Sequence, residues 1–309
     1  MKITLDLAKL VETGKISGEE AERLKTLAAP ATASLALNIL LAFGVMAVAG
    51  GVIGLLPVPS ISLAVGLALC VAGIWLQIER REDWMVLGTI FMLVGSIVAA
   101  LSVAVLASGH PAALFAAAIA FGVISWQTKS GLMAGLAVLA LSAALGGQTG
   151  YRDATYAIAI HQPTVSILLF SALAYAAYVL SKRMGADNAR VMIIAARTAI
   201  LIVNVAFLVG SIWGDSLRLF SEQSGMALPE ISRMTFIVGW ALAIIAAAIF
   251  AVRANRPWLV TTAAVFGSIH FYTQWFERLG ATPGSILFAG CLALGIAIML
   301  MRYHRQKTA

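Results

Sequence analysis

Long apolar runs, each close to twenty residues, follow one another along most of the chain and are separated by short polar segments. A helix of about 20 apolar residues spans the hydrocarbon core of a bilayer, which is about 30 Å thick. The pattern therefore predicts an all-α, polytopic integral membrane protein with ten transmembrane helices. The expected spans are residues 33–56, 60–78, 84–107, 111–127, 131–147, 163–181, 191–212, 232–251, 258–276 and 283–302.

The first thirty residues are polar and predict a short cytoplasmic helical hairpin that precedes the ten-helix domain of residues 31–309. Gly14 is placed to end the first helix of this hairpin. Ser17 and Glu20 have the Ser-x-x-Glu spacing of a capping box, in which each side chain binds a free backbone N–H at the start of a helix. A hairpin of this size cannot bury a core of its own, so we expect it to dock on the membrane domain or on a partner.

Two connecting segments carry further structure. Residues 151–163 are expected either to extend the sixth span as a helix kinked at Pro163 or to lie at the membrane interface. The connection 213–231 is expected to hold a short surface helix capped by Asp215.

Two small-residue patterns predict close helix packing: Gly50-x-x-x-Gly54 and Gly131-x-x-x-Gly135.

The distribution of basic residues predicts the orientation. With a cytoplasmic N-terminus, sixteen of the 21 Lys and Arg residues lie in inner segments, and one, Arg197, lies within a span. Basic residues gather on the cytoplasmic side of membrane proteins, and only an even number of crossings keeps both basic ends inside. We therefore expect both termini in the cytoplasm. The four outer basic residues are Arg152, Arg218, Arg233 and Arg278.

Composition and motifs exclude several functions. Only 11% of the residues are charged, against about 25% in soluble domains, so the net charge of +7 indicates membrane lipids as partners rather than nucleic acid. The two cysteines and four histidines have no ligand spacing, and we expect neither a metal nor another cofactor. No acidic residue lies well inside a predicted span and no Walker motif occurs, which argues against a carboxylate-based or ATP-driven pump. The Gly-Asp-Ser-Leu string at 214–217 lacks the soluble α/β context of a hydrolase, and we expect no enzyme.

A first set of candidate polar groups lies on the seventh predicted span. Arg190, Arg197, Asn204 and Ser211 are seven residues apart and therefore fall near one face of a helix. They either form a polar path in which Arg197 holds an anion, or Arg197 reaches the cytoplasmic surface and Asn204 binds a neighbouring helix. Trp240 lies deeper than the other six tryptophans, which are near predicted span ends, and it joins the candidate contacts.

A second set closes the ninth predicted span. His270, Gln274 and Glu277 share one helix face, and Tyr272 and Trp275 share another. These residues either line an outward-facing pocket, with Tyr272 among its contacts, or form an interfacial belt in which His270 binds a neighbouring helix.

Both ends of the chain resemble a known family. The opening LVETGKISGEEAERL and the closing FYTQWFERLGATPGSILFAGCLALGIAIMLMRYHR resemble the bacterial domain-of-unknown-function 2157 family of predicted membrane proteins. The resemblance implies a bacterial inner membrane protein and brings no established activity. The layout alone is similar to the drug/metabolite transporter superfamily, whose two five-helix halves would correspond to residues 33–147 and 163–302.

Two functional hypotheses follow. The first is a small-solute or lipid-precursor permease with a polar path that uses Arg197, Asn204 and His270. The alternative is a membrane scaffold or sensor that transports nothing and recruits a cytoplasmic protein partner through residues 1–28.

Overall fold

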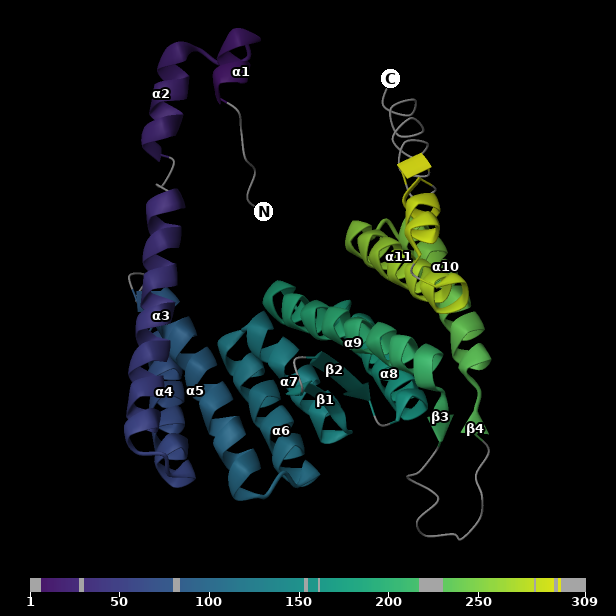
Figure 1. Ribbon diagram of the computed structural model, residues 1–309. Coiled ribbons are helices and arrows are strands. Elements are labelled where there is room, and N and C mark those ends of the chain that lie inside the picture. Colours follow the sequence, from purple (N-terminus) through teal and green to yellow (C-terminus); the bar gives the residue numbers. More distant parts are fainter. Residues whose placement is uncertain are drawn as a thin grey trace. The chain divides into compact units, whose positions relative to one another are not determined.

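The computed structural model describes residues 7–27, 31–79, 84–152, 155–160, 162–216, 230–280, 282–291 and 294–295. These residues are almost entirely helical, with two short antiparallel strand pairs (Figure 1). The chain divides into two compact units, residues 1–109 and 110–309.

The first unit contains five helices: α1 (Leu7–Glu12), α2 (Gly18–Leu27), α3 (Ala31–Leu55), α4 (Pro59–Ile78) and α5 (Met85–Leu106). The second unit contains α6 (Pro111–Thr128), α7 (Gly131–Ala144), β1 (Gly147–Arg152), β2 (Thr155–Ile160), α8 (Pro163–Ser181), α9 (Ala186–Trp213), β3 (Asp215–Ser216), β4 (Glu230–Ile231), α10 (Arg233–Arg253) and α11 (Pro257–Leu279). Residues 283–291 and 294–295 are also helical.

In the part of the chain that the structure describes, six helices are long and apolar enough to cross a membrane, which indicates a membrane location. They are α4, α5, α6, α8, α9 and α10. The apolar segments Ile39–Leu55 and Gly131–Ala144 are shorter. The helix α11 has 23 residues but is not among the six, and its second half carries the polar groups His270, Gln274, Glu277 and Arg278. Ten crossings therefore stay a prediction, although α3 to α11 each begin and end within a few residues of a predicted span.

Prolines set the start of four helices. Pro59, Pro111, Pro163 and Pro257 are each the first residue of their helix, where the missing N–H is not needed and the fixed φ suits the helix. Pro163 therefore begins α8 and does not kink it.

The ends of α1 and α2 are formed by the predicted local motifs. Gly14 has φ +67°, and the N–H groups of Gly14 and Lys15 donate to the carbonyls of Val11 and Leu10, which is the hydrogen-bond pattern of a Schellman motif. At α2, the backbone N–H of Glu20 donates to Ser17 Oγ at 3.1 Å, and the N–H of Ser17 donates to Glu20 Oε2 at 2.8 Å. Both the helix stop and the capping box are confirmed, while the cytoplasmic location of the pair stays a prediction.

Glycines allow α4 and α5 to pack with their backbones in contact. A Cβ atom at Gly73 would collide with the backbone of Met92, and one at Gly95 would collide with the backbone of Cys70. The two predicted Gly-x-x-x-Gly patterns differ in their packing. Gly131 packs against Ile194, whereas none of the described residues lies within 4 Å of a Cβ at Gly50 or Gly54. Close packing was therefore predicted correctly at residue 131 but not at residues 50 and 54.

The segment before α8 is a β-hairpin and not an extension of a helix. Strand β1 pairs antiparallel with β2 from Gly147 opposite Ile160 to Arg152 opposite Thr155. The side chains of 155–160, Thr-Tyr-Ala-Ile-Ala-Ile, alternate large and small and include β-branched residues, which favours an extended strand. The helical prediction for residues 151–163 is wrong because the two strands pair with each other and Ile160 of β2 packs against Ala206 and Val209 of α9, which lie far along the chain.

Asp215 has a different role from the one predicted. It lies in β3, is only 3% exposed, and its Oδ2 accepts a hydrogen bond from the backbone N–H of Thr164 at 2.8 Å. Thr164 is the second residue of α8, so the Asp215 carboxylate caps the start of α8 from across the fold. The predicted surface helix falls on residues 217–229, which are outside the described residues.

Candidate functional site

A cavity of about 780 Å³ lies between α8, α9, α10 and α11 of the second unit. Most of its wall is apolar, and its residues extend from Ala196 to Phe207 on α9 and from Ala243 to Phe250 on α10. Eleven residues of α-helix correspond to about 16 Å at about 1.5 Å per residue. This large cavity is therefore about half as long as a bilayer core is thick.

Two cations and three aromatic rings mark one end of the large cavity. Lys182 Nζ lies 4.5 Å from the centroid of the Tyr178 ring, and the Arg256 guanidinium lies 5.6 Å from the same centroid. Tyr178 also meets Phe250 edge to face at 6.2 Å. Trp258 has none of these contacts but lines the same cavity. We call Lys182, Arg256, Tyr178, Phe250 and Trp258 together the basic end of the cavity.

A hydrogen-bonded pair of side chains lies toward the opposite end of the large cavity. Asn204 lines the cavity, and its side-chain oxygen accepts a hydrogen bond from Trp240 Nε1 at 3.0 Å. The Asn204 amide nitrogen donates to the carbonyl of Ile200 one turn earlier at 2.8 Å. Trp240 is fully buried, with no exposed surface. The prediction that Asn204 binds a neighbouring helix is confirmed, and its partner is Trp240.

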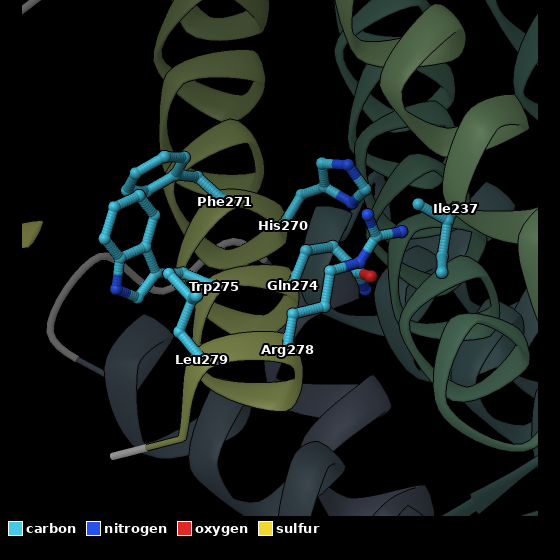
Figure 2. A pocket seen from close by; sticks show the side chains of 7 residues that line it. All are labelled: Ile237, His270, Phe271, Gln274, Trp275, Arg278 and Leu279. Atoms are coloured by element: carbon cyan, nitrogen blue, oxygen red, sulfur yellow. The ribbon is translucent and has the colours of Figure 1, made fainter. Parts of the chain in front are cut away.

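A second, smaller cavity of about 450 Å³ lies beyond Trp240. Its lining includes His270, Gln274 and Arg278 of α11 and Ile237 of α10. Figure 2 shows these three α11 side chains extending toward Ile237, with Phe271 and Trp275 on another side of the helix. Among the described residues, the Nδ1 atom of His270 and the amide nitrogen of Gln274 are buried and have no hydrogen-bond partner. A buried polar atom usually has such a partner, so these two are notable next to the small cavity.

Trp240 contacts one lining residue of each cavity but is itself in the lining of neither. On α10, Ile237 lines the small cavity and Ala243 lines the large one, three residues to either side of Trp240. On the neighbouring helices, His270 of the small cavity meets the Trp240 ring edge to face at 4.8 Å, and Asn204 of the large cavity binds its nitrogen. Through these two contacts the Trp240 ring links His270 of the small cavity with Asn204 of the large one.

The remaining predicted residues lie outside both linings. Arg197 is exposed, and its guanidinium lies 4.8 Å from the Trp258 ring centroid. Tyr272 packs against Phe271 and Phe276, and Glu277 is exposed. The structure therefore brings Asn204, Trp240, His270 and Gln274 together and leaves the other three at the periphery.

Sequence reasoning missed Lys182, Arg256 and Arg278. Arg278 could have been found, because it follows His270 and Gln274 at four-residue steps, and that spacing places all three on one helix face. Lys182 and Arg256 follow different helices and meet only at Tyr178, so no local pattern pairs them.

The two cavities offer side chains that can bind a ligand. The side chains that line them offer cations, amide and imidazole nitrogens and apolar surface, and none of the described lining residues is acidic. Within the described part of the chain, no group of three or more His, Cys, Asp or Glu residues is arranged to hold a metal ion. Comparison with known proteins gave no further assignment, since no family model, no curated protein and no solved structure matches the chain.

Proposed function

We propose that this protein is a membrane permease for a small solute or a lipid precursor, and that its route passes between α9, α10 and α11 at Trp240. The observation that carries this proposal is a pair of cavities whose lining residues His270 and Asn204 both contact the buried Trp240 ring. A permease needs a binding space that opens to one side at a time, and a thin partition between two such spaces is the closed form of that arrangement.

The same proposal assigns the sides of the membrane. The basic end of the large cavity, with Lys182 and Arg256, faces the cytoplasm, in agreement with the excess of basic residues expected there. The small cavity with Arg278 opens toward the opposite side. Both chain termini are then cytoplasmic, in the inner membrane of a bacterium.

Cysteine accessibility tests this route without knowledge of the substrate. In a chain with Cys70→Ser and Cys291→Ser, single cysteines are placed at Ile237 and Ala243 and exposed to a membrane-impermeant maleimide from either side. We expect Ala243→Cys to react from the basic end and Ile237→Cys from the other, with slow reaction of each from its far side as the protein changes state.

Opening the partition should raise the far-side rates. Replacing a buried Trp by Ala lowers the free energy of unfolding by about 3–5 kcal/mol. A destabilisation of the closed state relative to the open state by about a third of this amount raises the open population about tenfold. Trp240→Ala should therefore speed far-side labelling about tenfold. Cysteines at Val238 and Leu242, which are exposed on α10 and line neither cavity, are the matched controls and should stay unreactive in lipid. Labelling confined to the near side in both backgrounds would rule out the route.

The scaffold hypothesis places function in residues 1–28 instead. Val11 and Leu24, on α1 and α2, are each 38% exposed, and apolar side chains at the surface are consistent with a partner. Deleting residues 1–28 would then abolish function in the cell. Under the permease proposal the deletion leaves the labelling of Ile237→Cys and Ala243→Cys unchanged.

A further inference from the structure

The wall of the large cavity is poorly suited to a polar solute. Thr262 Oγ1 already donates to the carbonyl of Trp258 at 2.9 Å, and both polar atoms of the Asn204 side chain are bonded to protein groups. Around them the wall consists mainly of Ala, Ile, Val and Phe side chains. A sugar or amino acid placed there would lose its hydrogen bonds to water with little replacement, whereas an alkyl chain would gain by burial.

The basic end has the opposite character. Lys182 and Arg256 have aromatic partners but no acidic partner among the described residues. Two cations that both contact the Tyr178 ring, without an acidic partner in the described part of the chain, favour the binding of a phosphate or carboxylate. Because Arg197 lies over Trp258, which lines the cavity, a third cation is present at this end.

We infer that the large cavity binds a single-chain amphiphile with an anionic headgroup, with the headgroup at Lys182 and Arg256 and the chain extending along α9 toward Asn204. This inference rests on the proposed function and names its substrate class. The length of about 16 Å between the levels of Ala196 and Phe207 accommodates an extended alkyl chain. Charge at one end and apolar surface along the remainder match the two parts of such a molecule.

The small cavity supports the same ligand class. Arg278 lines it together with the amide of Gln274, whose nitrogen is buried without a partner. A cation and an amide donor form a second place for an anionic group on the far side of Trp240. An anionic head that leaves Lys182 and Arg256 thus finds a complementary site beyond the partition.

Equilibrium binding of radiolabelled hexadecyl phosphate tests the inference. The full-length protein is placed in phosphatidylcholine nanodiscs, and binding to protein-free discs is subtracted. We expect saturable binding about tenfold or more tighter than that of hexadecylphosphocholine, because the zwitterionic head offers a compensating positive charge to the two cations. Inorganic phosphate should not compete, because it lacks the chain that the apolar wall binds.

Paired variants locate the headgroup. Lys182→Gln with Arg256→Gln should weaken hexadecyl phosphate binding about tenfold or more and leave hexadecylphosphocholine binding unchanged. The matched control is Lys129→Gln with Arg253→Gln: Lys129 lies over Trp126 in a similar cation–π contact, Arg253 is exposed at the end of α10, and neither lines the cavity. The control pair should bind as the parent does.

Filling the cavity provides a variant that removes no charge. Ala247→Phe places a ring in the apolar wall and should abolish binding of both amphiphiles, with Leu242→Phe on the exposed face of α10 as its control. Equal binding of the two headgroups, effective competition by inorganic phosphate, or no effect of the Lys182 and Arg256 pair would each overturn the inference. Selective binding without far-side cysteine labelling would instead preserve the ligand class and reject the permease.

Discussion

At the scale of single residues, the hydrogen bond between Trp240 and Asn204 is the most consequential polar contact of the bundle. Trp240→Phe keeps most of the ring volume but leaves the Asn204 oxygen without its donor. We expect a loss of about 1 kcal/mol in the free energy of unfolding. Denaturant unfolding in mixed micelles measures it, and Trp213→Phe, at a ring that is 63% exposed, should change stability by less than about 0.5 kcal/mol.

A double-mutant cycle identifies the cause of that loss. If the hydrogen bond is responsible, Trp240→Phe should have almost no effect once Asn204 has been replaced by Leu. An equal loss in both backgrounds would attribute the effect to packing of the indole rather than to its N–H group.

The buried carboxylate of Asp215 supports a second residue-scale prediction. Asp215→Ala leaves the Thr164 N–H at the start of α8 without its acceptor and removes a negative charge from the positive end of the helix dipole. We expect a loss of about 1–2 kcal/mol in the free energy of unfolding. Asp187→Ala, at an exposed acidic residue in the first turn of α9, should cost clearly less. Equal effects of the two variants would argue against a capping role for Asp215.

Residue-scale prediction from the sequence succeeds where a need is local and fails where its partner is distant. An asparagine deep in an apolar helix must find a hydrogen-bond partner, and this requirement is readable from the sequence around Asn204. The identity of the partner, Trp240, is 36 positions away and depends on the packing of α10 against α9. Asp215 was predicted to cap a following helix for a similar reason. Its actual partner, Thr164 at the start of α8, lies 51 positions earlier in the chain.

At the scale of elements, the tightest association is between α4 and α5. The glycines at 66 and 73 on α4 and at 88 and 95 on α5 are each seven residues apart, so they form matching flat strips on two antiparallel helices. Cys70 and Ser96 meet beside these strips at 3.2 Å, and Gln77 donates to Thr89 at 2.9 Å. Side-chain contact here depends on backbones that approach closely.

Alanine substitution tests this dependence. A methyl group at Gly73 or Gly95 would meet the backbone of the partner helix, which cannot move aside as a flexible side chain can. We expect Gly73→Ala and Gly95→Ala each to lower the free energy of unfolding by about 1–3 kcal/mol. Gly51→Ala and Gly54→Ala in α3, where nothing lies within 4 Å, should be neutral or slightly stabilising because alanine favours the helix. Thermal unfolding in detergent would show the contrast.

The extent of the helices was predictable because apolar length and first-turn prolines are properties of short segments. Pro59, Pro111, Pro163 and Pro257 mark helix starts directly. The pairing of β1 with β2 was not predicted, since the packing of Ile160 against Ala206 and Val209 of α9 joins residues far apart in the sequence. Likewise, the glycine strips of α4 and α5 have a seven-residue period that a search for Gly-x-x-x-Gly does not detect.

At the scale of the whole molecule, the number of membrane crossings decides which loops share a compartment. Six helices meet the criteria of length and apolarity, whereas the charge distribution fits ten crossings with both ends inside. The two counts differ at four segments: α3, whose described apolar stretch is the shorter Ile39–Leu55, α7 with 14 residues, α11 with its polar second half, and the predicted span 283–302, which is described only in part. A short helix can still cross where neighbours cover it or the bilayer thins, and a polar stretch can cross where it faces a cavity.

Cysteines on either side of α7 and α11 test the two of these segments on which the proposed route depends. In the chain without Cys70 and Cys291, single cysteines replace Gln127 and Gln162, which flank α7, and Asn255 and Leu279, which flank α11. Ten crossings predict that an impermeant maleimide labels Gln127→Cys and Asn255→Cys only from the cytoplasmic side, and Gln162→Cys and Leu279→Cys only from the other. If α7 and α11 do not cross, both members of each pair react from the same side. The small cavity with His270 and Gln274 would then lie at the same surface as the basic end, and no route through Trp240 could connect two compartments.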